Sequence, residues 1–197
     1  MIFEPTTYRV LLVSSSEKLN SSAAQWLSPS RYFPVHTARS VAAARQKLME
    51  ADYDLLLINA PLPDDFGLAL AEDVCAQSES AVLLIVRREL AEEVDAEAVR
   101  FGILTLPKPT NPQALSQALH VLSAMRERLR QAGKKQQSVQ EKIKELRLID
   151  RAKWALIGEY QMSEPEAHRY IEKRAMDSGK NRKQIAEEIL EQSGKGQ

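Results

Sequence analysis

Cysteine is nearly absent from the sequence, with Cys75 alone among 197 residues. A single thiol cannot form a disulfide within the chain, and one cysteine is typical of a reducing compartment, so we expect a cytoplasmic protein. Cys75 itself is expected to be a small core residue on a helix. The sequence has no apolar run of about 18 residues, so neither a membrane-spanning helix nor a membrane partner is expected. The start, MIFEPTTYRV, has no basic stretch ahead of an apolar one and predicts no secretory signal.

Net charge is also absent, because 27 Lys and Arg balance 27 Asp and Glu. The charges do not balance within each part of the chain. Residues 1–123 carry 10 basic and 15 acidic side chains, whereas residues 124–197 carry 17 basic and 12 acidic ones. This asymmetry favours an anionic partner for the C-terminal part, although a solvated helical face would have the same composition.

Short apolar runs alternate with helix-like segments over the first 120 residues or so. The predicted strands cover residues 9–13, 35–38, 55–58, 81–86 and 103–106, and the predicted helices cover residues 18–27, 41–51, 68–77 and 91–99, with a fifth helix following KPTNPQAL. Five alternating pairs predict a parallel sheet with helices on both faces, a flavodoxin-like doubly wound (βα)5 fold. Chemistry in such sheets gathers at the carboxyl ends of the strands. Those ends carry Ser14, Ser15, Asn59, Val86 and Lys108.

No strand pattern recurs after about residue 112, and a heptad pattern begins. Its ten positions, of which nine are apolar, are Leu115, Ala118, Leu122, Met125, Leu129, Ala132, Gln136, Val139, Ile143 and Leu146. This spacing, with charged residues between, predicts a two-stranded coiled coil. The expected dimer contacts are Leu122, Met125, Leu129, Val139, Ile143 and Leu146. One alternative is a long helix packed on its own domain. Gly133 predicts a break or bend near residues 131–137.

The last 50 residues or so have the pattern of a small helical bundle. Ser163 and Glu166 form a capping-box pattern that starts a helix, Gly179 is placed to end it, and Asn181 can cap a final helix. Together with a helix over about 143–160, these signals predict a three-helix bundle, with a fold that is α/β in its first part and all-α in its second.

The α/β part contains the stretches YDLLLINAPLPDDFG and LPKP. Through them it resembles the receiver domain of bacterial response regulators. It implies paired acids that bind Mg²⁺ after the first strand, a phosphoryl-accepting aspartate after the third, a hydroxyl after the fourth and a lysine after the fifth. This sequence has Ser14 and Ser15, Asn59, Val86 and Lys108 at those positions, so only the lysine matches.

These substitutions remove the chemistry that the resemblance implies. A neutral amide at Asn59 cannot attack phosphorus, and serine hydroxyls are poor ligands for Mg²⁺. We therefore predict a pseudo-receiver with no catalytic residue, metal or cofactor, and not an enzyme. Its fold is expected to serve dimerisation or to bind a regulatory protein or ligand. Asp64 and Asp65, farther along the loop, are a weak alternative metal site.

The C-terminal part contains Asp150-Arg151-Ala152-Lys153, Leu156, MSEPEAHRYI and Lys173-Arg174-Ala175-Met176. Through these residues it resembles the ANTAR domain, the RNA-binding module of AmiR and NasR-type transcription antitermination regulators. It implies a dimer that holds two stem-loops of a leader transcript and so prevents termination. The division that follows is a receiver-like domain at residues 1–122, a coiled-coil linker at 123–141 and an ANTAR domain at 142–197.

Loop RNA is held by cations on phosphates and by planar side chains on unstacked bases. The candidate RNA-binding residues are Lys144, Arg147, Arg151, Lys153, Arg169, Tyr170, Lys173, Arg174, Lys180, Arg182 and Lys183. Trp154 and His168 are further candidates for stacking, and Tyr170 could equally be a core residue.

Two other function classes remain open at this stage. Receiver architecture in general favours a DNA-binding response regulator, although no helix-turn-helix pattern is evident in the C-terminal part. A protein–protein adaptor would leave the basic face solvated. A phosphotransfer enzyme is disfavoured by Asn59.

Overall fold

A computed structural model describes residues 7–193 of the chain. The chain divides into two compact units, Met1–Gly133 and Lys134–Gln197, below called the N-terminal and C-terminal units. The boundary falls inside residues 123–141, the predicted linker. The first six residues, on which the expectation of no secretory signal partly rests, lie outside the described residues. Among residues 7–193, no helix combines the length and apolar character needed to cross a membrane.

The N-terminal unit is built on a five-stranded sheet. Its strands are β1 (Tyr8–Val13), β2 (Tyr32–Ala38), β3 (Leu55–Asn59), β4 (Ala81–Arg87) and β5 (Leu104–Lys108). Neighbouring strands pair in parallel in the order β2-β1-β3-β4-β5. The predicted doubly wound fold is therefore confirmed, and the order reverses between β1 and β3, where such sheets place their ligand sites.

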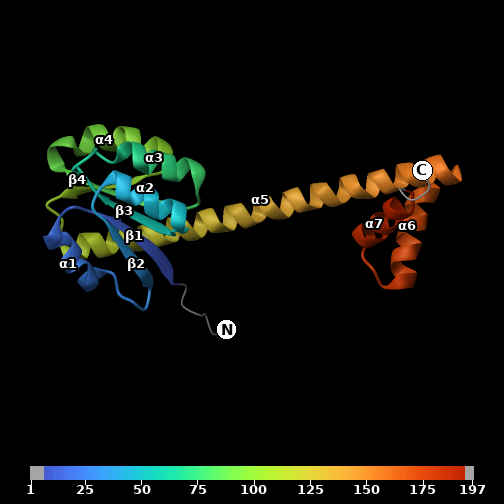
Figure 1. The fold of residues 1–197 in the computed structure, drawn as a ribbon, viewed down its shortest axis with the longest axis horizontal. Coiled ribbons are helices and arrows are strands. Elements are labelled where there is room, and N and C mark those ends of the chain that lie inside the picture. The colour runs from blue at the N-terminus through green and yellow to red at the C-terminus, as the bar shows by residue number, and fades with distance from the viewer. Residues whose placement is uncertain (1–6, 194–197) are drawn as a thin grey trace. The chain divides into compact units, whose positions relative to one another are not determined.

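Helices cover both faces of this sheet (Figure 1). They are α1 (Glu17–Trp26), α2 (Val41–Glu50), α3 (Leu68–Gln77), α4 (Ala91–Ala98) and the long α5 (Pro112–Tyr160), with two 3-10 turns, η1 (Arg88–Leu90) and η2 (Val99–Phe101). Buried side chains of α2, α3 and α4 share one core with one face of the sheet. Those of α1 and the first turns of α5 share a second core with the other face. Cys75 on α3 is partly buried beside the first core, and burial raises the pKa of its thiol to about 11.

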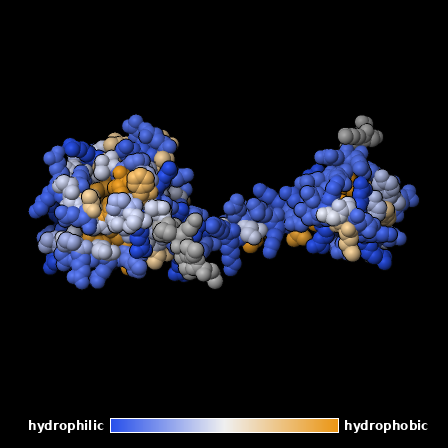
Figure 2. Space-filling view, turned by 90° about the horizontal axis from the view of Figure 1, so that it is seen from below, coloured by the Kyte–Doolittle hydropathy of each residue, from blue (hydrophilic) through white to orange (hydrophobic). Residues whose placement is uncertain are grey.

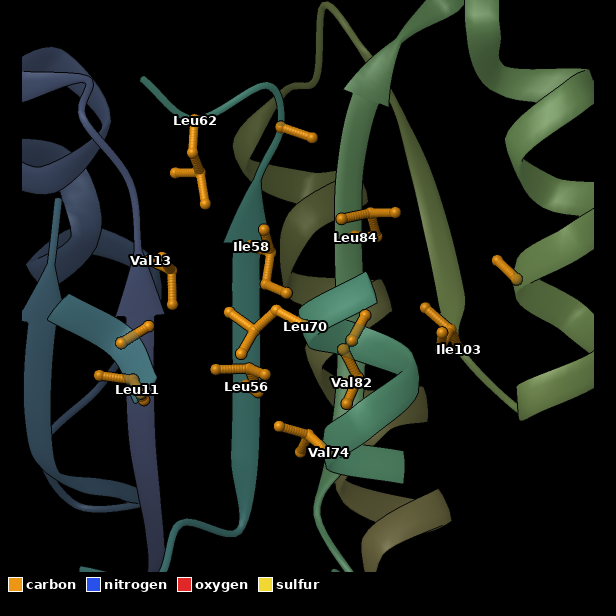
Figure 3. Close-up of a cluster of buried hydrophobic side chains, with 14 of the residues drawn as sticks. Leu11, Val13, Leu56, Ile58, Leu62, Leu70, Val74, Val82, Leu84 and Ile103 are labelled. Carbon is orange, nitrogen blue, oxygen red and sulfur yellow. The ribbon is translucent and has the colours of Figure 1, made fainter. Parts of the chain in front are cut away.

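The central strand β3 shows why the apolar runs are continuous. Leu56 and Ile58 enter the first core, shown in Figure 3, whereas Leu55 and Leu57 enter the second. All four side chains have no exposed surface. A strand buried on both faces has no solvent side for polar residues, so the run ends only where the strand reaches the sheet edge, at Asn59.

The helix α5 runs unbroken for 49 residues. It begins where Asn111 Oδ1 accepts a hydrogen bond from Ala114 N at 2.7 Å. Leu115 and Leu122 in its first turns are buried in the second core of the N-terminal unit, and Leu122 has no exposed surface. The prediction that Leu122 contacts a partner helix is therefore wrong, because its side chain already packs against the sheet. Met125 also packs against this core while partly buried.

The expected break near residues 131–137 is also wrong, since the helix continues through Gly133. Arg126, earlier in the helix, ties α5 to the loops before β3 and β4 through ion pairs to Asp54 (2.9 Å) and Glu79 (3.1 Å). A Cβ added at Gly133 would lie 1.8 Å from Glu79 Oε1. Gly133 thus leaves room for the Glu79 carboxylate against the helix, and it does not end the helix.

The C-terminal unit is the predicted three-helix bundle. The end of α5 packs with α6 (Glu164–Ser178) and α7 (Arg182–Ser193) around a core of Ile149, Ala152, Leu156, Ala167, Ile171, Ala175, Ile185, Ala186 and Ile189. The sequence signals for the starts and ends of its helices are confirmed. Ser163 N donates to Glu166 Oε2 at 2.8 Å, Gln184 N donates to Asn181 Oδ1 at 2.9 Å, and Gly179 ends α6 with a φ of 67°.

Candidate nucleic-acid interface

The strand ends of the N-terminal unit bring two of the predicted residues into contact. Asn59 Nδ2 donates a hydrogen bond of 3.0 Å to Ser14 Oγ, which also accepts one of 3.1 Å from Ser16 N. Ser14 is fully buried, whereas Ser15 is exposed. The position between β1 and β3 is therefore occupied by a hydrogen bond between two neutral side chains.

Val86 and Lys108 complete this edge of the sheet without adding a nucleophile or an anion. Val86 is fully buried at the end of β4. Lys108 Nζ donates a hydrogen bond to the carbonyl oxygen of Ala60. Partial burial, and secondarily the nearby Arg87, lowers the pKa of Lys108. The peptide bond between Lys108 and Pro109 is cis, as the receiver resemblance suggests.

The two loop aspartates bind the backbone. The carboxylate of Asp64 accepts hydrogen bonds from Val41 N (2.9 Å) and Ala42 N (3.0 Å) at the start of α2, and these bonds, chiefly that of Ala42, lower its pKa. Asp65 Oδ1 accepts one from Gly67 N at 2.7 Å. Within residues 7–193, no cluster of three His, Cys, Asp or Glu could hold a metal ion. The alternative metal site at these aspartates therefore has no support.

In the C-terminal unit, the end of α5 carries a stripe of exposed cations. Lys144, Arg147 and Arg151 follow one another at spacings of four or three residues, which places them on one face of the helix. Ile149 and Leu156 lie on a different face, buried in the bundle core. In the described part of the chain, none of the three cations forms an ion pair, so their charge is available to an anionic ligand.

One turn of α6 gathers three more candidates. Arg169, Tyr170 and Lys173 line a shallow pocket beside the end of α5. Arg169 Nε donates to the carbonyl oxygen of Pro165 at 3.2 Å, and Tyr170 Oη accepts from Arg174 Nη1 at 3.1 Å. These contacts fix the directions of side chains that would otherwise be mobile at the surface.

The remaining candidate cations are already paired with carboxylates. The pairs are Lys153 with Asp150 (2.9 Å) and Glu164 (3.2 Å), Arg174 with Glu188 (3.6 Å), Lys180 with Glu188, Arg182 with Glu172 (3.5 Å) and Lys183 with Glu187 (3.9 Å). Hydrogen bonds to Asp150 and then Glu164 raise the pKa of Lys153. Lys153 thus joins α5 to the start of α6. Because carboxylates already neutralise these five cations, they should attract a phosphate less strongly than the stripe on α5 does.

The two further candidates for stacking, Trp154 and His168, are both exposed. Trp154 is 71% exposed, as a stacking residue must be, and His168 lies 3.4 Å from Glu172. Tyr160 and Gln161 line the same pocket as Tyr170, although neither is among the candidates predicted from sequence. Their only sequence signal is their place at the junction of two predicted helices, with Tyr160 at the end of the first helix and Gln161 directly after it.

Comparison with known families accounts for both units. Residues 10–120 match the response regulator receiver domain, and residues 137–190 match the ANTAR domain. The chain belongs to the response regulators that carry an ANTAR domain. The receiver domain therefore lies within the N-terminal unit, and the ANTAR domain comprises the basic stripe and the three-helix bundle.

Individual relatives agree with this assignment. The transcriptional regulatory protein PdtaR of Mycobacterium tuberculosis (strain ATCC 25618 / H37Rv) is 26% identical over 191 residues, which cover 94% of this chain and 91% of PdtaR. The transcriptional regulatory protein CitT of Halalkalibacterium halodurans is 30% identical over 148 residues, which cover 72% of this chain and 62% of CitT. A crystal structure of the signal receiver domain of an HD domain-containing protein from Pseudomonas fluorescens Pf-5 is 28% identical, with a TM-score of 0.57, and the match covers 66% of this chain and 96% of that domain.

The receiver domain of this response regulator permits a direct test of its chemistry. Asn59→Asp supplies the missing carboxylate but leaves Ser14 and Ser15 where metal-binding acids are required. Because serine hydroxyls bind Mg²⁺ poorly, we expect no labelling of this variant by acetyl phosphate with Mg²⁺, measured by intact-protein mass spectrometry. The triple variant Ser14→Asp/Ser15→Asp/Asn59→Asp is the matched comparison. Clear phosphorylation of the single variant would contradict the assignment of Ser14 and Ser15 as the missing metal ligands.

Proposed function

We propose that this protein is an RNA-binding transcription antiterminator that holds paired stem-loops of a leader transcript as a dimer. The observation that carries the proposal is the stripe of exposed cations Lys144, Arg147 and Arg151, which form no ion pair within residues 7–193 and lie on an ANTAR domain with a formed core. Cations on one helix face can follow the phosphates of a single-stranded loop, and exposed planar side chains can stack on the loop bases. Holding the stem-loops would prevent an overlapping terminator from folding.

The state of the receiver domain supports control without phosphorylation. The hydrogen bond between Asn59 and Ser14 occupies the position of the acceptor and the metal ligands. We propose that the protein is not an enzyme, that it needs no metal or cofactor, and that a regulatory protein or ligand acts on the receiver domain. Work on nascent transcripts would place it in the cytoplasm.

The surface of α5 supports a homodimer. Leu122 and Met125 leave the predicted set because both pack against the core of the N-terminal unit. Leu129, Val139, Ile143 and Leu146 remain at heptad positions, and these residues are 42% to 62% exposed. Small apolar patches interrupt an otherwise hydrophilic surface along this helix (Figure 2). A second copy of the helix would bury these patches.

Fluorescence anisotropy with labelled RNA tests the proposal. The probe is a tandem hairpin with two small loops, compared with one hairpin and with a DNA duplex of equal length. We expect tight binding to the tandem hairpin that weakens with salt, with a log–log slope of about −0.7 for each phosphate contacted on single strands. Preference for the DNA duplex would instead favour a DNA-binding regulator. An absence of affinity for any nucleic acid would favour a protein–protein adaptor.

A further inference from the structure

A pocket of about 440 Å³ lies where α5 meets α6 in the ANTAR domain. It is lined by Tyr160, Gln161, Met162, Glu166, Arg169, Tyr170 and Lys173. The pocket combines two aromatic rings, two cations, an amide and a carboxylate. None of the three α5 stripe cations lines it, so it is a separate feature of the domain.

Gln161 has an unusual backbone for its residue type. Its φ is 52°, and it is the one non-glycine residue with positive φ in the described chain. The left-handed region favours glycine, which lacks the Cβ that clashes there. Glycine does occupy two comparable positions, Gly102 after η2 and Gly179 after α6.

The backbone conformation at residue 161 therefore does not explain why a glutamine side chain is present there. It is exposed, and its amide forms no hydrogen bond with another residue in the described range. A side chain retained where glycine fits better, with a free amide beside a pocket, points to a polar ligand in that pocket.

The pocket walls fit a nucleotide. Tyr160 is 62% exposed and Tyr170 is 37% exposed, so both rings offer surface on which a base can stack. The hydrogen bond from Arg174 holds the phenol end of Tyr170. Arg169 and Lys173 supply positive charge at the same pocket for the attached phosphate.

Glu166 determines which end of a nucleotide can lie near it. Its Oε2 accepts hydrogen bonds from Ser163 N (2.8 Å) and Ser163 Oγ (2.6 Å), and these bonds lower the pKa of Glu166. The resulting anion repels a phosphate, which is therefore directed to Arg169 and Lys173. The carboxylate and the Gln161 carbonyl oxygen both accept hydrogen bonds, as an exocyclic amine requires, and the Gln161 amide nitrogen can donate to a ring nitrogen.

We propose that this pocket takes one unpaired base of the RNA loop, an adenine or a cytosine, whose amine edge is read by Gln161 while Tyr170 and Tyr160 stack on the ring. The proposal rests on the proposed RNA binding and adds a position that selects the base. It makes Gln161 and Tyr160 part of the interface, beyond the cations predicted from sequence.

Gln161→Gly provides the test, because glycine suits the backbone better than glutamine does. We expect an unchanged or higher thermal unfolding midpoint together with binding to the tandem-hairpin RNA that is about tenfold weaker. The probe is then altered by replacing each loop adenine with purine and each loop cytosine with 2-pyrimidinone, which removes only the amine. At one loop position the wild-type protein should lose about tenfold in affinity. Gln161→Gly should lose much less at that position, because only the hydrogen bond from the amine to Glu166 is left to lose.

Two control variants separate this proposal from RNA binding in general. Met176→Ala changes a side chain that is 83% exposed on α6 outside the pocket and should bind as the wild type does. Arg151→Ala removes a stripe cation and should weaken binding to every loop analogue equally. If Arg151→Ala weakens binding while Gln161→Gly and all analogues leave it unchanged, the base pocket is overturned and the RNA-binding function stands. Failure of the wild-type protein to bind hairpin RNA would overturn both.

Discussion

Replacing Lys144, Arg147 and Arg151 together by glutamine is expected to weaken binding to tandem-hairpin RNA about a hundredfold at 0.1 M salt. Each cation that neutralises a single-strand phosphate contributes about 0.7 to the log–log salt slope through released counterions, so three contribute about 2. The slope itself should fall by the same amount. The fold should not suffer, because these side chains are exposed and no carboxylate in the described chain depends on them.

Anisotropy titrations from low to high salt measure both the affinity and the slope. The matched control replaces Lys180, Arg182 and Lys183 by glutamine, which removes the same charge from the same ANTAR domain. Each of these three is ion-paired, with Glu188, Glu172 and Glu187 respectively. The control should therefore lose far less affinity and slope than the stripe variant. Equal losses in the two variants would mean that net charge attracts the RNA and that the stripe has no special part.

The sheet could be predicted from sequence because each strand is indicated by the residues within it. Leu55 to Ile58 form an uninterrupted apolar run since both faces of β3 are covered. The placement of Ser14 and Asn59, 45 residues apart, at one edge of the sheet followed from topology alone, because parallel strands end at the same edge. The hydrogen bond between them was not predicted. The ends of α6 were predictable for the same local reason, from Ser163 and Gly179.

The role of the heptad pattern could not be predicted in the same way. Apolar residues at spacings of three and four look alike whether the helix packs on a sheet or on a second helix. Leu115 and Leu122 face the sheet, whereas Val139 and Ile143, in the same register, are half-exposed. Only tertiary structure separates the two parts of one continuous pattern.

The candidate site was predicted as a set of cations with Tyr170 among them, and the ion pairs between different helices could not be predicted from sequence. Lys153 meets Glu164 on the next helix, and Arg174 meets Glu188 on the one after. Spacing along one helix gives no information about such partners. The pocket at Gln161 was missed for a related reason, because the sign of a φ angle is not visible in a residue that is not glycine.

The second large effect is expected from the exposed apolar positions of α5. Changing Ile143 and Leu146 together to aspartate should convert a dimer into a monomer. These side chains are 44% and 62% exposed, so the charges remain solvated in the monomer and the bundle core around Ile149 is untouched. In a dimer the same charges would be buried against each other without partners, which is strongly unfavourable.

Loss of the dimer should also remove the higher affinity for RNA with two hairpins over RNA with one. Two linked binding sites can raise the affinity for a tandem ligand by roughly 10² to 10⁴ above that of one site. The monomeric variant loses this gain, so it should bind the tandem and the single hairpin almost equally. Sedimentation equilibrium over a concentration series measures the mass, and anisotropy measures the two affinities.

Met176→Asp, which alters an 83% exposed apolar residue on α6 outside the heptad positions, is the control and should remain dimeric. A variant that stays dimeric would place the dimer contact elsewhere, whereas a monomeric variant that still prefers the tandem hairpin would mean that a single ANTAR domain reads both loops.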